Sequence, residues 1–194
     1  MSLSENDLWL LSYYRHSEIN AAQFFARVAR FVRGPLLLDV THHFADEANH
    51  ANYWTKCIDE LDELPLKTQR AYQDQYIDAI GLPANVMEVM AITQVLEKRV
   101  IGQYRRHLRL PGIHPAVKQT MEKIMVDERW HIQYVRDALK AMEDKYGAEE
   151  IELTLKRHTA ADQEVYAKTL DEYSERVDAL TAAYQASAPA ETAR

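Results

Sequence analysis

Two segments of the sequence repeat an Asp-Glu-x-x-His pattern, which has the residue types and spacing of a metal site. The first runs from Asp46 to His50, and the second runs from Asp127 to His131. On a helix, residues three positions apart lie on one face, so the Glu and His of each segment can reach the same ion. A single Glu-x-x-His would mean little, but requiring the preceding Asp lowers the chance expectation to about 0.05 matches. The repeat therefore predicts a metal centre.

Two further glutamates stand where the remaining ligands of such a centre are expected. Glu18 and Glu47 lie almost equally far before and after a break in the sequence near residue 33. Glu97 and Glu128 lie in the same way on the two sides of a second break near residue 112. If each break is a tight turn between antiparallel helices, all four carboxylates lie at one height. The spacing thus predicts an internal two-fold in ligand placement.

Long helices must position these residues. The chain has 194 residues but only five glycines and six prolines, fewer than a sandwich, a barrel or a turn-rich α/β fold needs. Ser2 and Glu5 are spaced as a capping box for the first helix. Two short loops and one long connection predict an all-α four-helix bundle with one crossover and an added C-terminal helix. The breaks place helices at about 4–32, 35–61, 85–108, 115–146 and 149–184, with a short one around 70–80.

The chain is expected to form a single helical domain over 1–185. The bundle takes up about 4–146, the extra helix about 149–184, and 186–194 form a disordered tail. The extra helix carries a heptad-like apolar seam, which packs either on the bundle or on a second copy of the chain. This seam and the general frequency of two-fold assemblies predict a homodimer. The seam consists of Tyr166, Leu170, Tyr173, Val177, Leu180 and Tyr184.

With these residues in place, the chain resembles the ferritin-like di-iron carboxylate proteins. Their pattern is one Glu from each of two helices and a Glu-x-x-His from each of the other two. The resemblance covers residues 4–146. The paired Asp-Glu-x-x-His form is most similar to the oxygen-activating branch, with ribonucleotide reductase small subunits, bacterial multicomponent monooxygenases and arylamine N-oxygenases, whereas the size is nearer to aldehyde deformylating oxygenases. Six residues fill the positions, with Glu18 and His50 on one ion, Glu97 and His131 on the other, and Glu47 and Glu128 as bridges.

The resemblance implies a cofactor of two iron ions, with manganese or a mixed iron–manganese pair as alternatives. The charge balance favours metal, because four glutamates converging in an apolar bundle would be very costly unpaired and two divalent ions cancel their charge. The alternative is a set of buried salt bridges. Few basic residues share the ligand faces, since Lys98, Arg99 and Arg129 each point about 100° or more away from the neighbouring ligand.

The aspartate before each glutamate is expected to orient a histidine. A metal-bound His usually donates its second ring N–H to a carboxylate, which fixes the tautomer. In the oxygenases that the chain resembles, this Asp serves the His of the opposite motif. The resemblance therefore pairs Asp46 with His131, and it pairs Asp127 with His50. The alternative is that each Asp is a solvated surface charge.

Four other residues on the ligand faces are candidates for a part in the chemistry. Tyr14 and Tyr104 are candidate catalytic residues that relay electrons or protons, and core packing is the alternative for both. Trp54 is expected to be core packing. His43 precedes Glu47 by four residues and is open to three interpretations: an extra ligand, a proton donor or a hydrogen-bonded core histidine.

Composition excludes several function classes. With 23 basic and 30 acidic residues, the net charge is −7, which disfavours non-specific nucleic-acid binding. The single cysteine, Cys57, excludes an internal disulfide and a four-cysteine metal site, and it fits a reducing cytosol. No targeting signal is visible and no apolar run is long enough to cross a bilayer, so a cytoplasmic protein without a membrane span is expected. Because the chain has a single cysteine, the electrons for an oxygen-activating centre are expected to come from a separate donor or from the substrate itself.

The sequence-level hypothesis is a non-haem di-iron oxidase or oxygenase that uses O₂ to oxidise a small organic substrate. One alternative is a ferroxidase or iron-storage protein, whose centre usually has fewer histidines because iron must leave it. A second is a rubrerythrin-like peroxidase, although one cysteine leaves no room for a Cys-rich electron-transfer domain. A third is a bundle whose metals are purely structural, which a cavity beside the metals would argue against.

Overall fold

The computed structural model describes residues 3–67 and 72–187, and these residues form helices and no β-strand. This confirms the all-α class predicted from the sequence. Of the tail expected over 186–194, the first two residues belong to the last helix and the others lie outside the described residues. The helices are α1 (Glu5–Val28), α2 (Leu36–Asp59), α3 (Tyr72–Ile80), α4 (Val86–His107), α5 (Pro115–Ala141), α6 (Glu143–Tyr146) and α7 (Ala148–Ser187).

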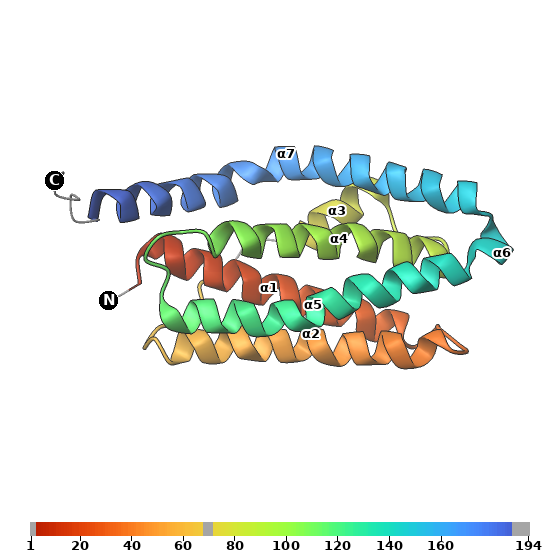
Figure 1. Ribbon diagram of the computed structural model, residues 1–194, viewed down its shortest axis with the longest axis horizontal. Helices are drawn as coiled ribbons and strands as arrows, with labels where there is room; N and C mark the ends of the chain where they lie inside the picture. Colours follow the sequence, from red (N-terminus) through yellow and green to blue (C-terminus); the bar gives the residue numbers. More distant parts are fainter. Residues whose placement is uncertain (1–2, 68–71, 188–194) are drawn as a thin grey trace, which may run out of the picture.

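Two antiparallel helix pairs form the centre of the molecule (Figure 1). The turn between α1 and α2 contains Gly34 at φ +75°, and the turn between α4 and α5 contains Gly112 at φ +84°. A side chain at Gly112 would also clash, because its Cβ would lie 2.9 Å from the ring of Tyr184. In Figure 1, α2 and α4 run in the same direction, and α3 lies between them in the chain.

The helix α7 runs along one side of these pairs and packs against α4, α1 and α3 (Figure 1). Tyr173, Val177 and Leu180 of its apolar seam are buried in a cluster with residues of α1 and α4. The seam therefore packs on the bundle of its own chain, which decides between the two alternatives. The side chain of Leu170 is outside the described part. The homodimer stays a prediction that rests on the frequency of two-fold assemblies alone.

The cap of the first helix differs from the one predicted. Ser4 caps α1, and its hydroxyl oxygen accepts a hydrogen bond from the backbone N–H of Asp7 at 3.1 Å. The Asp7 carboxylate in turn accepts a hydrogen bond from the Ser4 backbone N–H at 2.9 Å, which completes a capping box. Ser2 lies outside the described residues, and Glu5 is already the first helical residue. The capping box is thus two residues later than predicted.

Two helix ends also come earlier than predicted. α1 ends at Val28 and not near Val32, because the next residues tighten into i→i+3 hydrogen bonds, such as Phe31 N–H to Val28 O at 2.9 Å. α5 ends at Ala141, and the turn α6 follows as a separate element up to Tyr146. Neither Gly nor Pro marks this break, so the sequence carries no signal for it.

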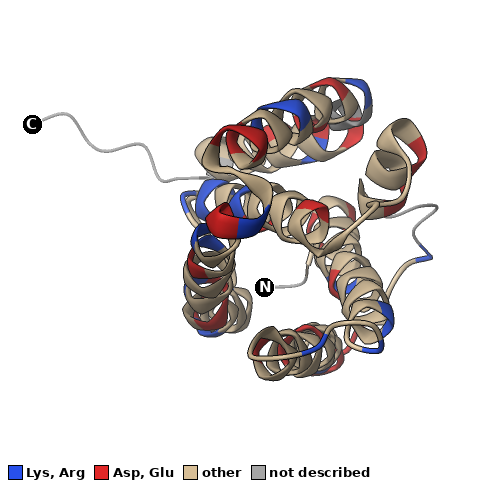
Figure 2. Cartoon of the chain, turned by 90° about the vertical axis from the view of Figure 1, so that its right-hand side faces the viewer, with Lys and Arg blue, Asp and Glu red and all other residues tan. Residues whose placement is uncertain are grey.

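Two apolar clusters occupy the interior on either side of the predicted ligands. One contains Leu10, Trp54 and Met121, and the other contains Val40 and Met90. Figure 2 looks along the helices and shows them end-on around a common centre, with charged positions spread over the bundle. The ligands lie at the level between the two clusters. Among the described residues, no helix has both the length and the apolar character needed to cross a membrane.

Candidate metal centre

The six predicted ligands converge from four helices at the middle of the bundle. α1 and α4 each supply one glutamate, and α2 and α5 each supply a Glu-x-x-His pair. Because residues three apart share a helix face, each pair points into the same space. The exposed fraction is 6% or less for all six, which are Glu18, Glu47, His50, Glu97, Glu128 and His131.

The first ligand group consists of Glu18, Glu47, His50 and Glu128, each with one donor atom within 4.8 Å of the others. His50 Nδ1 lies 3.3 Å from Glu128 Oε1 and 3.7 Å from Glu18 Oε2. This nitrogen is buried and has no hydrogen-bond partner. Three carboxylates and an unpartnered imidazole nitrogen around one point form a donor set that fits a divalent first-row metal ion.

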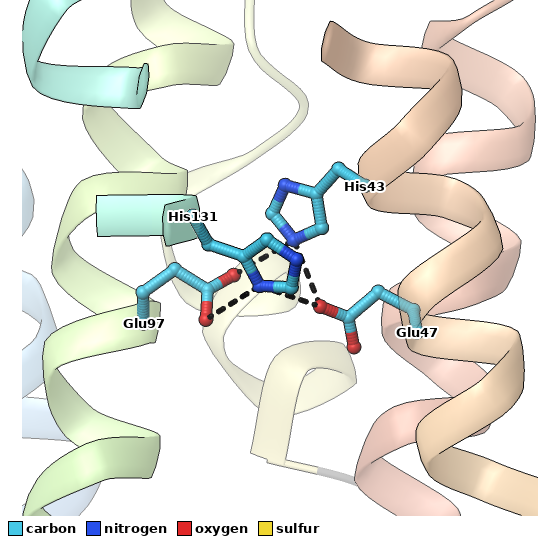
Figure 3. A group of neighbouring side chains, drawn as sticks. All are labelled: His43, Glu47, Glu97 and His131. Atoms are coloured by element: carbon cyan, nitrogen blue, oxygen red, sulfur yellow. Dashed lines mark hydrogen bonds and ion pairs between the residues drawn. The ribbon is translucent and has the colours of Figure 1, made fainter. Parts of the chain in front are cut away.

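The second ligand group consists of His43, Glu47, Glu97 and His131 (Figure 3). His43 Nε2 lies 2.8 Å from Glu47 Oε1 and 3.1 Å from Glu97 Oε1. His131 Nδ1 lies 3.5 Å from the same Glu47 oxygen and 4.0 Å from Glu97 Oε2. The second group therefore has two histidines and two carboxylates, and it can hold a metal ion of its own.

Two glutamates connect the groups. Glu47 belongs to both. Glu128 Oε1 lies 3.3 Å from His50 Nδ1, and Glu128 Oε2 lies 3.4 Å from His131 Nδ1. One oxygen of Glu128 thus faces the first group, and the other faces the second. This arrangement would allow both carboxylates to bridge a pair of ions.

The electrostatics of the cluster call for cations. In the described part of the chain, the ion-pair partners of the four glutamates are all histidines, without any Lys or Arg. Burial raises the pKa of Glu47 and of Glu97 well above the usual range, and repulsion between the glutamates raises both further. Burial lowers the pKa of His50, but the nearby carboxylates of Glu128 and Glu18 outweigh this effect and raise the pKa to about 11. The carboxylates thus draw positive charge to the place where a metal ion fits.

His43 has the surroundings of a metal ligand. Burial, and next the neighbouring His131, hold the pKa of His43 well below its usual value, so its imidazole is neutral. A neutral imidazole is the form that binds metals. Its other nitrogen, Nδ1, lies 2.7 Å from the hydroxyl of Tyr134, and its ring stacks on Phe25 with centroids 3.7 Å apart. The spacing of four residues before Glu47 was its only signal in the sequence, and Tyr134 gave none.

The two aspartates contact the histidines with which the resemblance pairs them. Asp127 Oδ2 lies 3.1 Å from His50 Nε2, and Asp46 Oδ2 lies 3.3 Å from His131 Nε2. Their side chains are 37% and 14% exposed, so neither is a fully solvated surface charge. With Nε2 donating to the aspartate, Nδ1 of each ring faces the glutamates, and it offers a lone pair to a metal ion once the ring has lost its second proton.

The two tyrosines predicted to be catalytic lie at different distances from the cluster. The Tyr104 hydroxyl donates a hydrogen bond to Glu18 Oε1 at 2.5 Å and accepts one from Trp54 Nε1 at 2.9 Å. Tyr14 does not contact a ligand; its ring lies 4.9 Å from that of Tyr104, and its hydroxyl is 3.1 Å from His107 Nδ1. Tyr104 is thus in a position to move a proton at the centre, and Tyr14 packs behind it.

A cavity of about 220 Å³ connects the ligand cluster to the surface between α1, α3 and α4. All four helices that carry ligands reach it, because Glu18, Glu47, Glu97 and Glu128 line its inner end. Apolar side chains such as Phe25, Ile92 and Leu96 line its middle. Its outer part is formed by exposed residues, which include Asp74 and Leu82. A small molecule can therefore reach the carboxylates without unfolding of the bundle.

Comparison with protein-family models, with curated proteins and with solved structures gave no match. Fold and site together define the class of this protein. It is an all-helical protein with two adjacent buried carboxylate–histidine groups that could each hold a metal ion.

Proposed function

We propose that this protein is a ferritin-like, non-haem di-iron oxidase or oxygenase that uses O₂ to oxidise a small organic substrate. One observation carries the proposal: two buried ligand groups share Glu47 and border a cavity that opens to the surface. A purely structural metal site is closed, and it has no use for such a cavity. Two antiparallel helix pairs joined by a long connection are also the arrangement that a ferritin-like bundle requires.

The donor set supports iron as the metal. Imidazole and carboxylate ligands suit iron, with manganese or a mixed iron–manganese pair as the alternatives. When bound, two iron ions supply a two-electron reductant for O₂. His43 joins the second ion as a ligand beyond the predicted six. Glu18 and His50 would hold the first ion, Glu97, His131 and His43 would hold the second, and Glu47 and Glu128 would contribute to both.

The chain's own residues orient the ligands, limit the access of water and hold a proton beside Glu18. Asp127 and Asp46 fix the tautomer and orientation of the two Glu-x-x-His imidazoles. The apolar clusters on both sides of the ligands leave the cavity as the route for water, and this limited access strengthens the charge interactions at the centre. The pKa of Tyr104 is raised well above its usual value by burial and then by Glu18, so its hydroxyl stays protonated and holds a hydrogen bond on that carboxylate.

A ferroxidase is the second candidate. Asp74 and Asp78 line the outer part of the cavity, and carboxylates at this place could conduct ferrous ions inward. The two functions differ in the fate of iron: an oxygenase retains two ions as a fixed cofactor, whereas a ferroxidase passes oxidised iron into a growing mineral.

Anaerobic loading with Fe²⁺ followed by exposure to O₂ distinguishes the two. We expect two irons per chain by elemental analysis, with O₂ uptake that stops once those two are oxidised. Glu128→Gln should lose iron, whereas Glu122→Gln, on the exposed face of the same helix, should retain it. Continued O₂ uptake with excess Fe²⁺ and mineral growth would favour the ferroxidase, and iron content unchanged in Glu128→Gln would refute the site.

A further inference from the structure

The cavity beside the ligands has a size that limits what it can bind. At about 220 Å³ it is smaller than the pockets of drug-sized ligands. A cavity of about 150 Å³ holds benzene, so by proportion this one holds about nine non-hydrogen atoms. Its middle is apolar, with Phe25, Ile92, Leu96 and Val100 in the wall. The body of the ligand is therefore a short hydrocarbon.

Two hydrogen-bond acceptors at the mouth of the cavity are poorly satisfied by the described residues. The Gln73 side-chain N–H donates to the Ser17 carbonyl oxygen at 3.3 Å, which fixes the amide orientation and leaves Oε1 buried with no partner. The neighbouring Asp74 is exposed, and among the described residues it accepts a long hydrogen bond, 3.4 Å, from the neutral Asn20 amide. A buried acceptor without a partner is unfavourable, so a ligand that brings donors stabilises the site.

We propose that this cavity binds a small primary amine, with its ammonium group at the mouth against Gln73 and Asp74 and its hydrocarbon end against the metal-binding glutamates. The proposal deepens the proposed function and rests on it for the chemistry at the inner end. An ammonium group has three donors and no acceptor, which complements the amide oxygen and the carboxylate. Asp78 and Arg27, further along α3 and α1, also line the cavity, so the two carboxylates outnumber the single guanidinium. The orientation makes the hydrocarbon end, and not the amine, the reacting part.

Calorimetric titration of the Zn²⁺-loaded protein tests the class of ligand, because zinc occupies the ligands without redox chemistry. The probes are octylamine, 1-octanol and octanoate, which share one hydrocarbon chain and differ in the head group. We expect octylamine to bind most tightly and octanoate most weakly. Each methylene removed from octylamine should weaken binding about fourfold, and chains longer than the cavity should gain nothing. Octanoate binding as tightly as octylamine would overturn the proposal.

Two variants test the mouth. Asp74→Asn should weaken octylamine binding about fivefold, as expected for an exposed charge pair, and should leave 1-octanol unaffected. Asp59→Asn, at the exposed end of α2, removes the same charge elsewhere and should change neither. An unchanged octylamine affinity in Asp74→Asn would contradict the proposal. A second outcome would also contradict it: Asp74→Asn loads Fe²⁺ more slowly and the parent protein does not bind octylamine. The mouth would then be an entry route for metal ions.

NMR spectroscopy tests the proposed orientation of the amine in the cavity. In the Mn²⁺-loaded protein, the paramagnetic ion broadens the NMR signals of nearby ligand protons. We expect the terminal methyl of octylamine to broaden more than the methylene beside nitrogen, and the reverse order would overturn the orientation. The failure of the proposed function looks different: the protein would then take up no O₂ while the head-group preference and the Asp74→Asn effect persist.

Discussion

The two candidate ion positions share Glu47 and differ in the residues one helical turn away. His43 precedes Glu47 by four residues, and the equivalent residue before Glu128 is Ile124. His43 faces the second group, whereas Ile124 is packed in an apolar cluster. The second position therefore has two imidazoles, and the first has one.

The residues that follow Glu97 and Glu18 by seven positions also differ. Tyr104 follows Glu97 by seven residues and donates to Glu18 at the first position. Phe25 follows Glu18 by seven residues and stacks on His43, with no polar group to offer. The internal two-fold thus determines where the carboxylates lie. Different residues at equivalent places next to them make the two positions unequal. We expect the second position to hold its ion more tightly, since a neutral imidazole adds a ligand without adding charge repulsion.

The strongest test of the comparison removes a ligand that both positions share. Glu47→Gln should weaken binding at both positions by about a thousandfold or more, because the remaining ligands lose a negative charge and a bridge. Glu97→Gln should affect the second position alone. Stepwise titration with Mn²⁺ counts the ions bound by each variant. If Glu47→Gln still binds one ion with unchanged affinity, Glu47 is not a bridge.

The next test removes the extra histidine. His43→Leu should weaken the second position by about a hundredfold and leave the first within a few-fold, since only one ion loses a ligand. Co²⁺ titration followed by absorbance resolves the two steps. Ile124→Val is the matched control: it should cost about 1 kcal/mol in the free energy of unfolding and leave both affinities unchanged. If His43→Leu bound both ions with the affinities of the parent chain, His43 would be only a core residue.

The ligand positions were predictable because helical spacing constrains them. Once the breaks near Gly34 and Gly112 are recognised, two motifs and two glutamates at matched distances must lie at one level. The contacts of Asp46 and Asp127 were predicted from the resemblance, since the Asp before each Glu serves the His of the opposite motif in the oxygenases that the chain resembles. Sequence could give this much without knowing how any side chain packs.

The rest depends on packing that the sequence does not encode locally. His43 has the spacing of a ligand and equally of a core histidine, and only its contacts with Glu47 and Glu97 separate the two. The seam of α7 has the same pattern whether it meets its own bundle or another chain. The break after Ala141 carries no Gly or Pro. The cavity arises from side chains of several helices, so no single segment predicts it.

The smallest expected effects come from the two hydroxyls that flank the positions. Tyr104→Phe removes the donor to Glu18 and leaves Trp54 Nε1 without its acceptor, and Tyr134→Phe removes the partner of His43 Nδ1. Each should cost about 1–2 kcal/mol in the free energy of unfolding of the metal-free protein. Each should also weaken one ion by about tenfold, because a ligand that has lost its outer partner is less well oriented.

The affected position should differ between the two variants. Tyr104→Phe should act on the first ion and Tyr134→Phe on the second, which paired Mn²⁺ titrations can measure. Tyr146→Phe, which removes a hydroxyl outside the ligand cluster, controls for the loss of any phenol. If both variants weakened the same ion, the hydroxyls would act through general packing and the two positions would not be individually tuned. A separate response at each position would mean that one residue on each side, added to a symmetric carboxylate frame, is enough to distinguish two otherwise equivalent ions.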